Sequence, residues 1–196
     1  MLMRIILASA SPRRLELLRM IGFKPEVRPS RVEEMTISDL PEEMVCELAE
    51  KKAHAVVETL IGEVKQETIV IGADTLVSLD GRALGKPQTK AEAIDMLHAY
   101  SNRAHFVWTG VSVWRLGENL EHMTFSEKTK VYVYPMTDVE IERYVAENHP
   151  MDKAGAYGIQ GPFSAFVSGI EGDYFNVVGL PIGHVYQAIK KLTNLK

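Results

Sequence analysis

Short apolar runs and helical apolar patterns alternate along the chain from its first residues. Residues 4–8 (RIILA) form an apolar run that predicts an interior strand. Apolar residues then recur at helical spacing between positions 15 and 21, and Gly22 is suited to the helix C-terminus. Ser11 is a good N-cap residue and Pro12 a good first helical residue, because the missing N–H of proline costs little there. The chain is therefore predicted to open with a strand, a tight turn and a helix.

The next predicted elements are an edge strand and a long helix. Residues 23–29 (FKPEVRP) are typical of an edge strand, and residues 30–40 form a polar connection. Asp39 and Glu42 predict a capping box at the start of the helix. The apolar face of this helix is formed by Val45, Leu48, Ala49, Ala53, Val56, Val57 and Leu60.

A buried strand and a hairpin are predicted in the middle of the chain. Residues 68–74 (TIVIGAD) form an apolar run typical of a buried strand. Residues 75–85 (TLVSLDGRALG) predict a hairpin with a type I′ turn at the Asp-Gly pair, residues 80–81. Thr89 and Glu92 predict a second capping box, at the start of a further helix.

Two long strands and a short helix are predicted next. Residues 104–135 are strand-rich, with two long segments joined at residues 117–119 (GEN). Thr137 and Glu140 predict a third capping box, and the helix that it opens is expected to end before Pro150.

The last part of the chain combines loop, strand and helix patterns. Residues 151–163 (MDKAGAYGIQGPF) are glycine-rich and predict a loop, residues 164–181 (SAFVSGIEGDYFNVVGLP) predict one or two strands, and Pro181 starts a final helix. The mixture of parallel-type and hairpin-type strands predicts an α/β or α+β fold. The length suits one domain over residues 1–196 or two small lobes, and a chain of this size can bury its own core.

The charge balance argues against two large classes of partner. The chain has 196 residues with 22 basic and 26 acidic side chains, and its net charge is −4. Affinity for nucleic acid or for a membrane surface usually requires a basic excess, so neither partner is expected. No run approaches the ~18 apolar residues of a membrane span, and the expected location is the cytoplasm. No G-x-x-x-x-G-K-[ST] occurs, which excludes a Walker A loop.

Two adjacent arginines at the predicted helix start suggest a site for an anion. Cations in the first turn of a helix are slightly unfavourable, because the backbone already carries positive partial charge there. A bound anion would compensate for Arg13 and Arg14, whose forked side chains match phosphate oxygens. Ser9 and Ser11 add hydroxyl donors. The residues predict a polyphosphate site, and a solvated surface pair is the alternative.

Carboxylates and lysines elsewhere extend this hypothesis. Asp74 ends the strand pattern TIVIGAD, and α/β sites lie at the carboxyl ends of strands, although a structural turn is an equal alternative. Glu33 and Glu34 follow the edge strand, where they are either solvated or, beside a phosphate, ligands for Mg²⁺ or Mn²⁺. Lys52 and Lys86, each taken alone, would be surface lysines.

Several short motifs, spread over nearly the whole chain, are similar to those of one known family. They are LASASPRRLELL, VEE, ELAEKKA, VIGADTLV, GKPQT, DKAGAYGIQG and GDYFNVVGLP. In order and spacing they resemble the motifs of the Maf family, from Ile5 to about Ile189. Maf proteins are nucleoside triphosphate pyrophosphatases, related in fold to the inosine triphosphate pyrophosphatases. The resemblance implies an elongated, two-lobed α/β fold with a central mixed sheet, flanking helices and a cleft between the lobes.

Three of these motifs resemble one subgroup of the family, which acts on dTTP and UTP. This subgroup has two arginines after Ser-Pro, then ADT, then AYGIQG, whereas the subgroup acting on 7-methyl-GTP has a tryptophan after Ser-Pro, SDQ, and no Gly-Ile-Gln. The resemblance implies hydrolysis of dTTP and UTP, and of modified pyrimidine nucleotides, to the monophosphate and pyrophosphate. Two alternatives stay open, a 7-methyl-GTP pyrophosphatase and a nucleotide-binding regulator of septum formation.

The resemblance also implies roles for particular residues. Asp74 matches the family's proposed proton acceptor. Catalytic roles are implied for Asp74, Glu34, Lys52 and Lys86. Substrate-binding roles are implied for Ser9, Arg13, Arg14, Thr75, Gln160, Asp152 and Lys153, and of these Arg13, Thr75 and Gln160 match positions associated with base preference. A divalent cation, Mg²⁺ or Mn²⁺, is expected on Glu34 and Asp74, and a homodimer is a family expectation.

Overall fold

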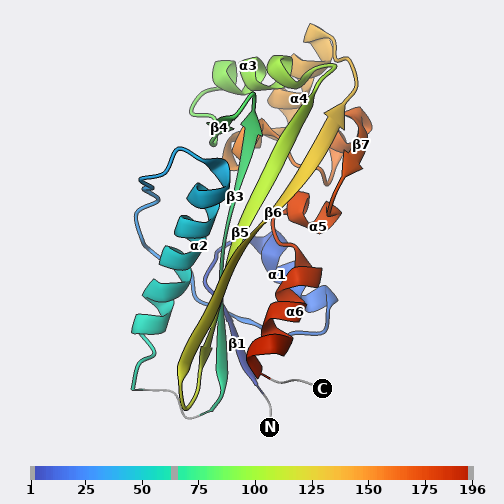
Figure 1. Ribbon diagram of the computed structural model, residues 1–196. Coiled ribbons are helices and arrows are strands. Elements are labelled where there is room, and N and C mark those ends of the chain that lie inside the picture. Colours follow the sequence, from blue (N-terminus) through green and yellow to red (C-terminus); the bar gives the residue numbers. More distant parts are fainter. Residues whose placement is uncertain (1–2, 63–65, 194–196) are drawn as a thin grey trace.

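One mixed sheet runs through the elongated molecule and carries helices on both faces (Figure 1). The computed structural model describes residues 3–62 and 66–193, so residues 1–2, 63–65 and 194–196 of the predicted domain lie outside the description. The strands are β1 (Arg4–Leu7), β2 (Glu26–Val27), β3 (Thr68–Leu79), β4 (Arg82–Leu84), β5 (Ala104–Leu116), β6 (Leu120–Val133) and β7 (Val167–Glu171).

The strand order makes the sheet mixed, as the sequence predicts. It is β2-β1-β3-β5-β6-β7, with β4 paired to the end of β3. The β1 strand is parallel to both β2 and β3, whereas the pairs β3–β5, β5–β6 and β6–β7 are antiparallel. The short edge strand β2 and the long β5–β6 hairpin are both found where the sequence predicts them.

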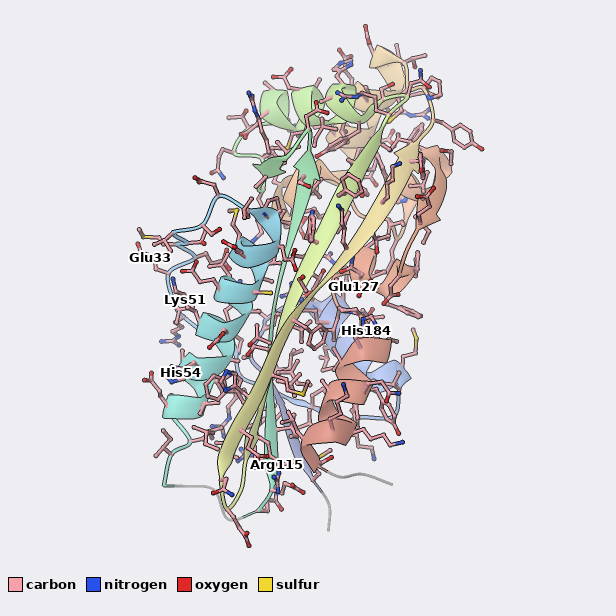
Figure 2. All side chains as sticks on the ribbon, in the orientation of Figure 1. Glu33, Lys51, His54, Arg115, Glu127 and His184 are labelled. Carbon is pink, nitrogen blue, oxygen red and sulfur yellow. The ribbon has the colours of Figure 1, made fainter. Side chains whose placement is uncertain are left out.

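Different helices cover the two faces of the sheet and its far end. The helices are α1 (Pro12–Met20), α2 (Pro41–Glu58), α3 (Lys90–Tyr100), α4 (Asp138–Asn148), α5 (Tyr174–Val178) and α6 (Ile182–Thr193), and the 3₁₀ turns are η1 (Pro150–Asp152), η2 (Ala154–Ala156) and η3 (Pro162–Phe166). Figure 1 shows α2 on one face, α1 and α6 on the other, and α3 and α4 at one end. On α6, His184 Nδ1 lies 2.7 Å from Glu127 Oε2 on β6 (Figure 2).

Helix α2 packs on the sheet through all of its predicted apolar positions, which are buried. The contact is closest at two glycines, because a Cβ at Gly72 on β3 would lie 2.7 Å from the nitrogen of Ala53. A Cβ at Gly110 on β5 would overlap the carbonyl oxygen of Val45. The helix backbone therefore lies directly on the strand backbone, and this fixes the height of α2 side chains above the sheet.

Several local predictions are confirmed. The Ser11 side chain caps α1 by accepting from the Arg14 N–H, and Gly22 follows the helix with a positive φ of 89°. The β3–β4 turn has positive φ at both Asp80 and Gly81, as a type I′ turn requires. The capping box of Thr137 at the start of α4 forms in both directions.

The predicted capping box at Asp39 and Glu42 is wrong. The N-cap residue of α2 is Leu40, which makes no side-chain cap hydrogen bond. Ser38 instead accepts from the Leu40 N–H at 3.1 Å and donates to Glu43 at 2.6 Å. Ser38, two residues before the N-cap, therefore makes side-chain hydrogen bonds of the kind predicted for Asp39.

Two further predictions need correction. The box at Thr89 forms in one direction, since Thr89 accepts from the Glu92 N–H while the Glu92 carboxylate accepts from the Gln88 N–H instead. Residues 164–181 hold one strand, β7, followed by helix α5, because the Asp173 side chain caps that helix by accepting from the Phe175 N–H at 2.8 Å.

The segments predicted as a separate strand and hairpin arm are one continuous strand, β3. Asp74 therefore lies in the middle of a strand and not at its carboxyl end. The cause is β5, which pairs with β3 without interruption and places Gly110 opposite Asp74. The parallel partner β1 does end nearby, with its last pair between Leu7 and Ile71. The carboxyl end that matters for the site is thus that of β1.

The close contact at Gly110 predicts a large effect of one methyl group. Gly110→Ala should lower the free energy of unfolding by about 3 kcal/mol, because the added Cβ forces α2 away from the sheet. Urea unfolding measures this change. Gly183→Ala is the control, since Gly183 is exposed on α6 with nothing within 4 Å of an added Cβ, and alanine there should be neutral or stabilising. Equal stability of the two variants would contradict the packing argument.

Candidate active site

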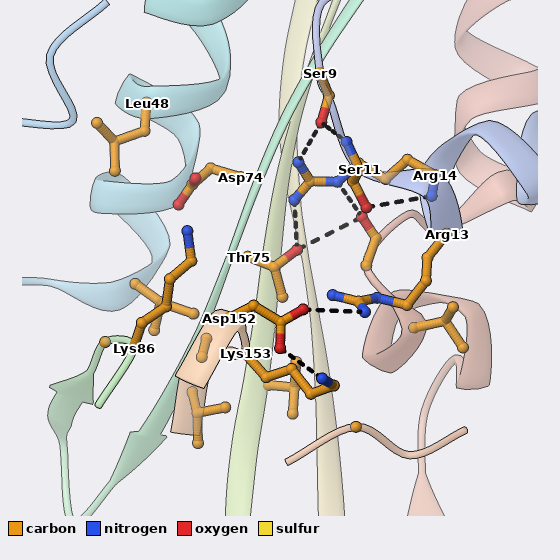
Figure 3. A pocket seen from close by; sticks show the side chains of 18 of the residues that line it. Ser9, Ser11, Arg13, Arg14, Leu48, Asp74, Thr75, Lys86, Asp152 and Lys153 are labelled. Carbon is orange, nitrogen blue, oxygen red and sulfur yellow. Dashed lines mark hydrogen bonds and ion pairs between the residues drawn. The ribbon is translucent and has the colours of Figure 1, made fainter. Parts of the chain in front are cut away.

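A cleft of about 950 Å³ gathers every residue to which the family resemblance assigns a role. Figure 3 shows part of its lining. It is lined by the β1–α1 turn, the loop after β2, helix α2, the middle of β3, the β4 region, η1, η2 and the end of α5. The predicted residues on its walls are Ser9, Arg13, Arg14, Glu34, Lys52, Asp74, Thr75, Lys86, Asp152, Lys153 and Gln160. Their convergence is a tertiary fact, because they come from seven segments of the chain; their roles remain predictions.

The cleft is built around an open stretch in the edge of β3. On this side β1 pairs with β3 only as far as Ile71, and β4 pairs with it only from Val77 onwards. Successive strand residues point to opposite faces. The side chain of Asp74 accordingly faces α2, whereas that of Thr75 faces α1 and α5. Side chains from both faces of the sheet therefore reach the same cleft through this unpaired stretch of β3.

On the α2 face, Lys52 joins two carboxylates. Its Nζ lies 2.6 Å from Asp74 Oδ1 and 2.6 Å from Glu34 Oε1. The side chains of Lys52 and Asp74 are only 12% and 14% exposed, whereas that of Glu34 is 54% exposed. The hydrogen bond from Lys52 lowers the pKa of Glu34 against the opposing effect of burial, and the charge of Lys86 adds to the lowering. Glu34 is thus held as a carboxylate at the cleft wall.

The neighbouring Glu33 does not share this position. It is exposed, does not line the cleft, and lies on the outer side of the loop (Figure 2). Of the two glutamates considered, Glu34 is the one that the structure places in the site.

On the opposite face, Arg14 directs its guanidinium at the protein and not at open space. Its Nε donates to the carbonyl of Gly179 at 2.8 Å, and its terminal nitrogens donate to Ser9 Oγ (3.1 Å), the carbonyl of Ala73 (2.9 Å) and Thr75 Oγ1 (3.0 Å). Burial lowers the pKa of Arg14, and the charge of Asp74 opposes this effect. Four of its five N–H groups are therefore engaged before any ligand binds.

The two adjacent arginines thus differ, and the alternative of a solvated surface pair is wrong. Arg13 lies at the mouth of the cleft, with its Nη1 atom 4.0 Å from Asp152 Oδ2 (Figure 3). Asp152 also accepts from the adjacent Lys153 at 2.5 Å. Burial raises the pKa of Asp152, but Lys153 and Arg13 outweigh it and the net direction is downwards. An exposed carboxylate therefore sits between two cations in the cleft.

The hydroxyl of Thr75 makes its hydrogen bonds with other groups of the protein. It accepts from Arg14 and lies 2.9 Å from Thr109 Oγ1, which itself donates to the carbonyl of Asn176 at 3.0 Å. The Thr75 hydroxyl also lies 3.5 Å from the carbonyl of Gly179, which already accepts from Arg14 at 2.8 Å. With the Thr109 proton on Asn176, the closer acceptor for the Thr75 proton is Thr109. Thr75 then has no donor left for a ligand and keeps one lone pair as an acceptor.

Sequence reasoning missed the residues that support this arrangement. Thr109 and Asn176 are fully buried polar residues, and the carbonyls of Ala73 and Gly179 carry no side-chain signal at all. Asn176 lies inside the motif GDYFNVVGLP, but nothing in that motif indicates that its carbonyl ends a hydrogen-bond chain from Arg14.

A divalent cation fits the donor set only in partnership with a substrate. Over residues 3–62 and 66–193, no group of three or more histidine, cysteine or acidic residues could hold a metal ion. The site offers two carboxylates, Glu34 and Asp74. Mg²⁺ is commonly held by one or two carboxylates together with phosphate oxygens and water, so this pair fits an ion whose other ligands come from a phosphate group.

No helix within the described ranges is long and apolar enough to cross a membrane.

The fold and the site define a mixed α/β protein whose open, cation-rich cleft holds paired carboxylates. A profile of the family described as "Maf-like protein" matches residues 4–192, and the chain belongs to this family. It is 46% identical to the dTTP/UTP pyrophosphatase of Carboxydothermus hydrogenoformans, over 96% of this chain and 98% of the relative. It is 44% identical to the protein of the same name from Agathobacter rectalis (96% and 97%) and 46% identical to that from Bacillus anthracis (96% and 95%).

Likeness to solved structures is weaker. The dITP/XTP pyrophosphatase of Mycobacterium abscessus is 12% identical over 98% of this chain and 100% of its own, with a TM-score of 0.39. A HAM1 protein from Coxiella burnetii is 16% identical over 67% of this chain and 73% of its own, with the same TM-score of 0.39.

The hydrogen bonds of Arg14 predict that lysine cannot replace it. Arg14→Lys keeps the charge but loses the fork, and it leaves buried acceptors without donors, so the free energy of unfolding should fall by about 3 kcal/mol. Arg13→Lys is the matched control, since Arg13 makes one long ion pair and should lose less than about 0.5 kcal/mol. Urea unfolding of both variants checks this difference, and similar losses would refute the structural role of Arg14.

Proposed function

We propose that this protein hydrolyses dTTP and UTP to the nucleoside monophosphate and pyrophosphate. The observation that carries the proposal is the cleft, in which Lys52, Asp74 and Glu34 converge and further basic side chains line the mouth. The near-full-length identity to proteins named dTTP/UTP pyrophosphatases supports the same reading.

The triphosphate is bound by the positive side chains that the protein leaves available. Arg13, Lys86 and Lys153 line the cleft, and the positive end of the α1 helix dipole favours an anion there. In the free protein the exposed carboxylate of Asp152 pairs with Arg13 and Lys153, where a phosphate group of the substrate would bind. Arg14, whose N–H groups are mostly engaged, shapes this end of the cleft and is not the main phosphate ligand.

Asp74 is proposed as the base for the attacking water. Its Oδ1 accepts from Lys52, which leaves Oδ2 to take a proton from water as the water oxygen bonds to phosphorus. The bond between the α and β phosphates breaks, and pyrophosphate leaves with its negative charge stabilised by the cations of the cleft. A divalent cation on Glu34 and Asp74 would neutralise charge on the phosphate oxygens when bound.

Base recognition is proposed for the opposite face of β3. When Thr75 gives its proton to Thr109, it is left as an acceptor. This matches the N3–H of thymine or uracil, which is a donor, and not N3 of cytosine, which is an acceptor. Gln160 lines the same cleft and offers both an amide donor and a carbonyl acceptor for the remaining edge. A site that hydrogen-bonds one edge in this way can reject a base with the opposite pattern strongly.

A nucleotide panel tests the proposal directly. With Mg²⁺ or Mn²⁺ we expect turnover of dTTP and UTP, with pyrophosphate and monophosphate as products, and much slower turnover of CTP, GTP and dITP. Preferential turnover of 7-methyl-GTP would keep the reaction and overturn the assignment of the base. Tight nucleotide binding without turnover of any member would favour a regulatory protein instead.

Replacing Asp74 tests the chemical step. Asp74→Asn keeps the shape of the side chain but removes the base, so kcat for dTTP should fall by about 10²–10⁴. The control is Asp80→Asn, because Asp80 lies in the turn after the same strand, is exposed, and forms an ion pair with Arg103 outside the cleft. Steady-state release of pyrophosphate measures both variants. Near-normal kcat in Asp74→Asn would remove this residue from the role of base.

A further inference from the structure

A buried polar cluster adjoins the wall of the cleft that carries Gln160. It consists of His105 on β5, Tyr157 just after η2, and Tyr100 at the end of α3. The Nε2 atom of His105 and the hydroxyl of Tyr157 are 2.6 Å apart. His105 is 1% exposed and Tyr157 is 5% exposed, so this hydrogen bond is shielded from water. Neither residue takes part in the proposed chemistry.

The aromatic rings around the hydrogen bond hold it tightly. The centroid of the His105 ring lies 4.5 Å from that of Tyr100 and 5.2 Å from that of Tyr157, to which it is nearly perpendicular. On its other side the Tyr157 ring lies 4.4 Å from Phe163 on η3. The ring of Tyr157 is therefore packed on several sides, and its hydroxyl has one polar partner.

Both partners are uncharged at neutral pH. Burial lowers the pKa of His105 to about 4, and burial raises the pKa of Tyr157 well above its ordinary value. Among the described residues, His105 Nδ1 and Tyr100 Oη have no hydrogen-bond partner. The bond between His105 Nε2 and Tyr157 Oη is thus the polar link of this cluster, and it joins β5 to the wall of the cleft.

The backbone around Tyr157 needs such a link. Gly155 and Ala156 both have positive φ, 67° and 61°, which is unfavourable for the alanine. A Cβ at Gly155 would lie 2.6 Å from the Tyr100 hydroxyl, so the segment is pressed against the cluster. Beyond Tyr157, two glycines enclose Ile159 and Gln160, and the second, Gly161, again has a positive φ of 90°. Gln160 is exposed and follows the buried Ile159, so its place depends on how Tyr157 and Ile159 are held in the core.

We infer that His105 and Tyr157 are positioning residues for base recognition, because their buried hydrogen bond fixes the start of segment 158–161 and thereby holds the Gln160 amide against the base. The inference rests on the proposed hydrolysis of dTTP and UTP. The two side chains act through Gln160, while Asp74, Glu34 and Lys52 are held by β3 and α2. Loss of the hydrogen bond should therefore impair the choice of base more than the chemical step.

The test compares two variants that each remove one buried hydroxyl. Tyr157→Phe keeps the ring packing and removes the bond to His105, whereas Tyr100→Phe removes a hydroxyl that has no hydrogen-bond partner. In Tyr157→Phe we expect the ratio of kcat/KM for dTTP over CTP to fall about three- to tenfold, through a higher KM for dTTP with little change in kcat. Gln160→Ala should change the ratio in the same direction, and Tyr100→Phe should leave it unchanged.

Hydrogen exchange gives a readout that does not depend on turnover. Amides of residues 154–161 should exchange faster in Tyr157→Phe than in the wild type, and those of Tyr100→Phe should match the wild type. His105→Phe should act like Tyr157→Phe, and the double variant should be no worse than the worse single one. If His105→Phe fails to fold, the Tyr157→Phe comparison still decides the matter.

The outcomes separate this inference from the proposed function. An unchanged dTTP over CTP ratio in folded Tyr157→Phe would overturn the inference, as would an equal loss of activity on every nucleotide. If the wild type hydrolyses neither dTTP nor UTP, the proposed function falls. The exchange rates of residues 154–161 would then still show whether the hydrogen bond fixes this segment.

Discussion

The guanidinium of Arg14 is the group on which the geometry of the cleft depends. It donates to Ser9, Ala73, Thr75 and Gly179, which lie up to 165 positions away from it in the chain. One of these acceptors is a carbonyl on the open edge of β3, where no neighbouring strand supplies a donor. A charged side chain thus replaces the missing strand, and this allows the edge of a buried strand to stay open to a substrate without leaving its backbone unsatisfied.

The open edge also explains how one cleft can combine chemistry and recognition. Adjacent residues of β3 point to opposite faces of the sheet, so Asp74 meets the lysine of α2 while Thr75 meets Arg14. The α2 side depends on glycine contacts, because Gly72 and Gly110 let the helix lie on the strand backbone and bring Lys52 within reach of Asp74. In the proposed function the reacting phosphates and the base occupy the two sides of this gap.

The two sides are supported in different ways. The carboxylates are held by a rigid helix and a central strand, whereas Gln160 sits on a glycine-bounded segment without regular structure. An exposed amide on such a segment can select a ligand only if buried neighbours hold the backbone of the segment in place. The buried pair of His105 and Tyr157 is placed to do this, which gives the interior of the protein a part in the proposed specificity.

The sequence by itself determined the features that depend on neighbouring residues: the capped start of α1, the turn at Asp80 and the buried face of α2. It also supplied, through the motifs shared with the family, the residues that the fold brings together in the cleft. Tertiary structure alone decided that Asp74 lies inside a long strand, because its pairing partner β5 is more than 30 positions away. It also separated the roles of Arg13 and Arg14, which the sequence treated as a pair. Successive helix residues are rotated by about 100°, so one arginine faces the solvent-filled mouth and the other faces buried carbonyls that only the folded chain brings together.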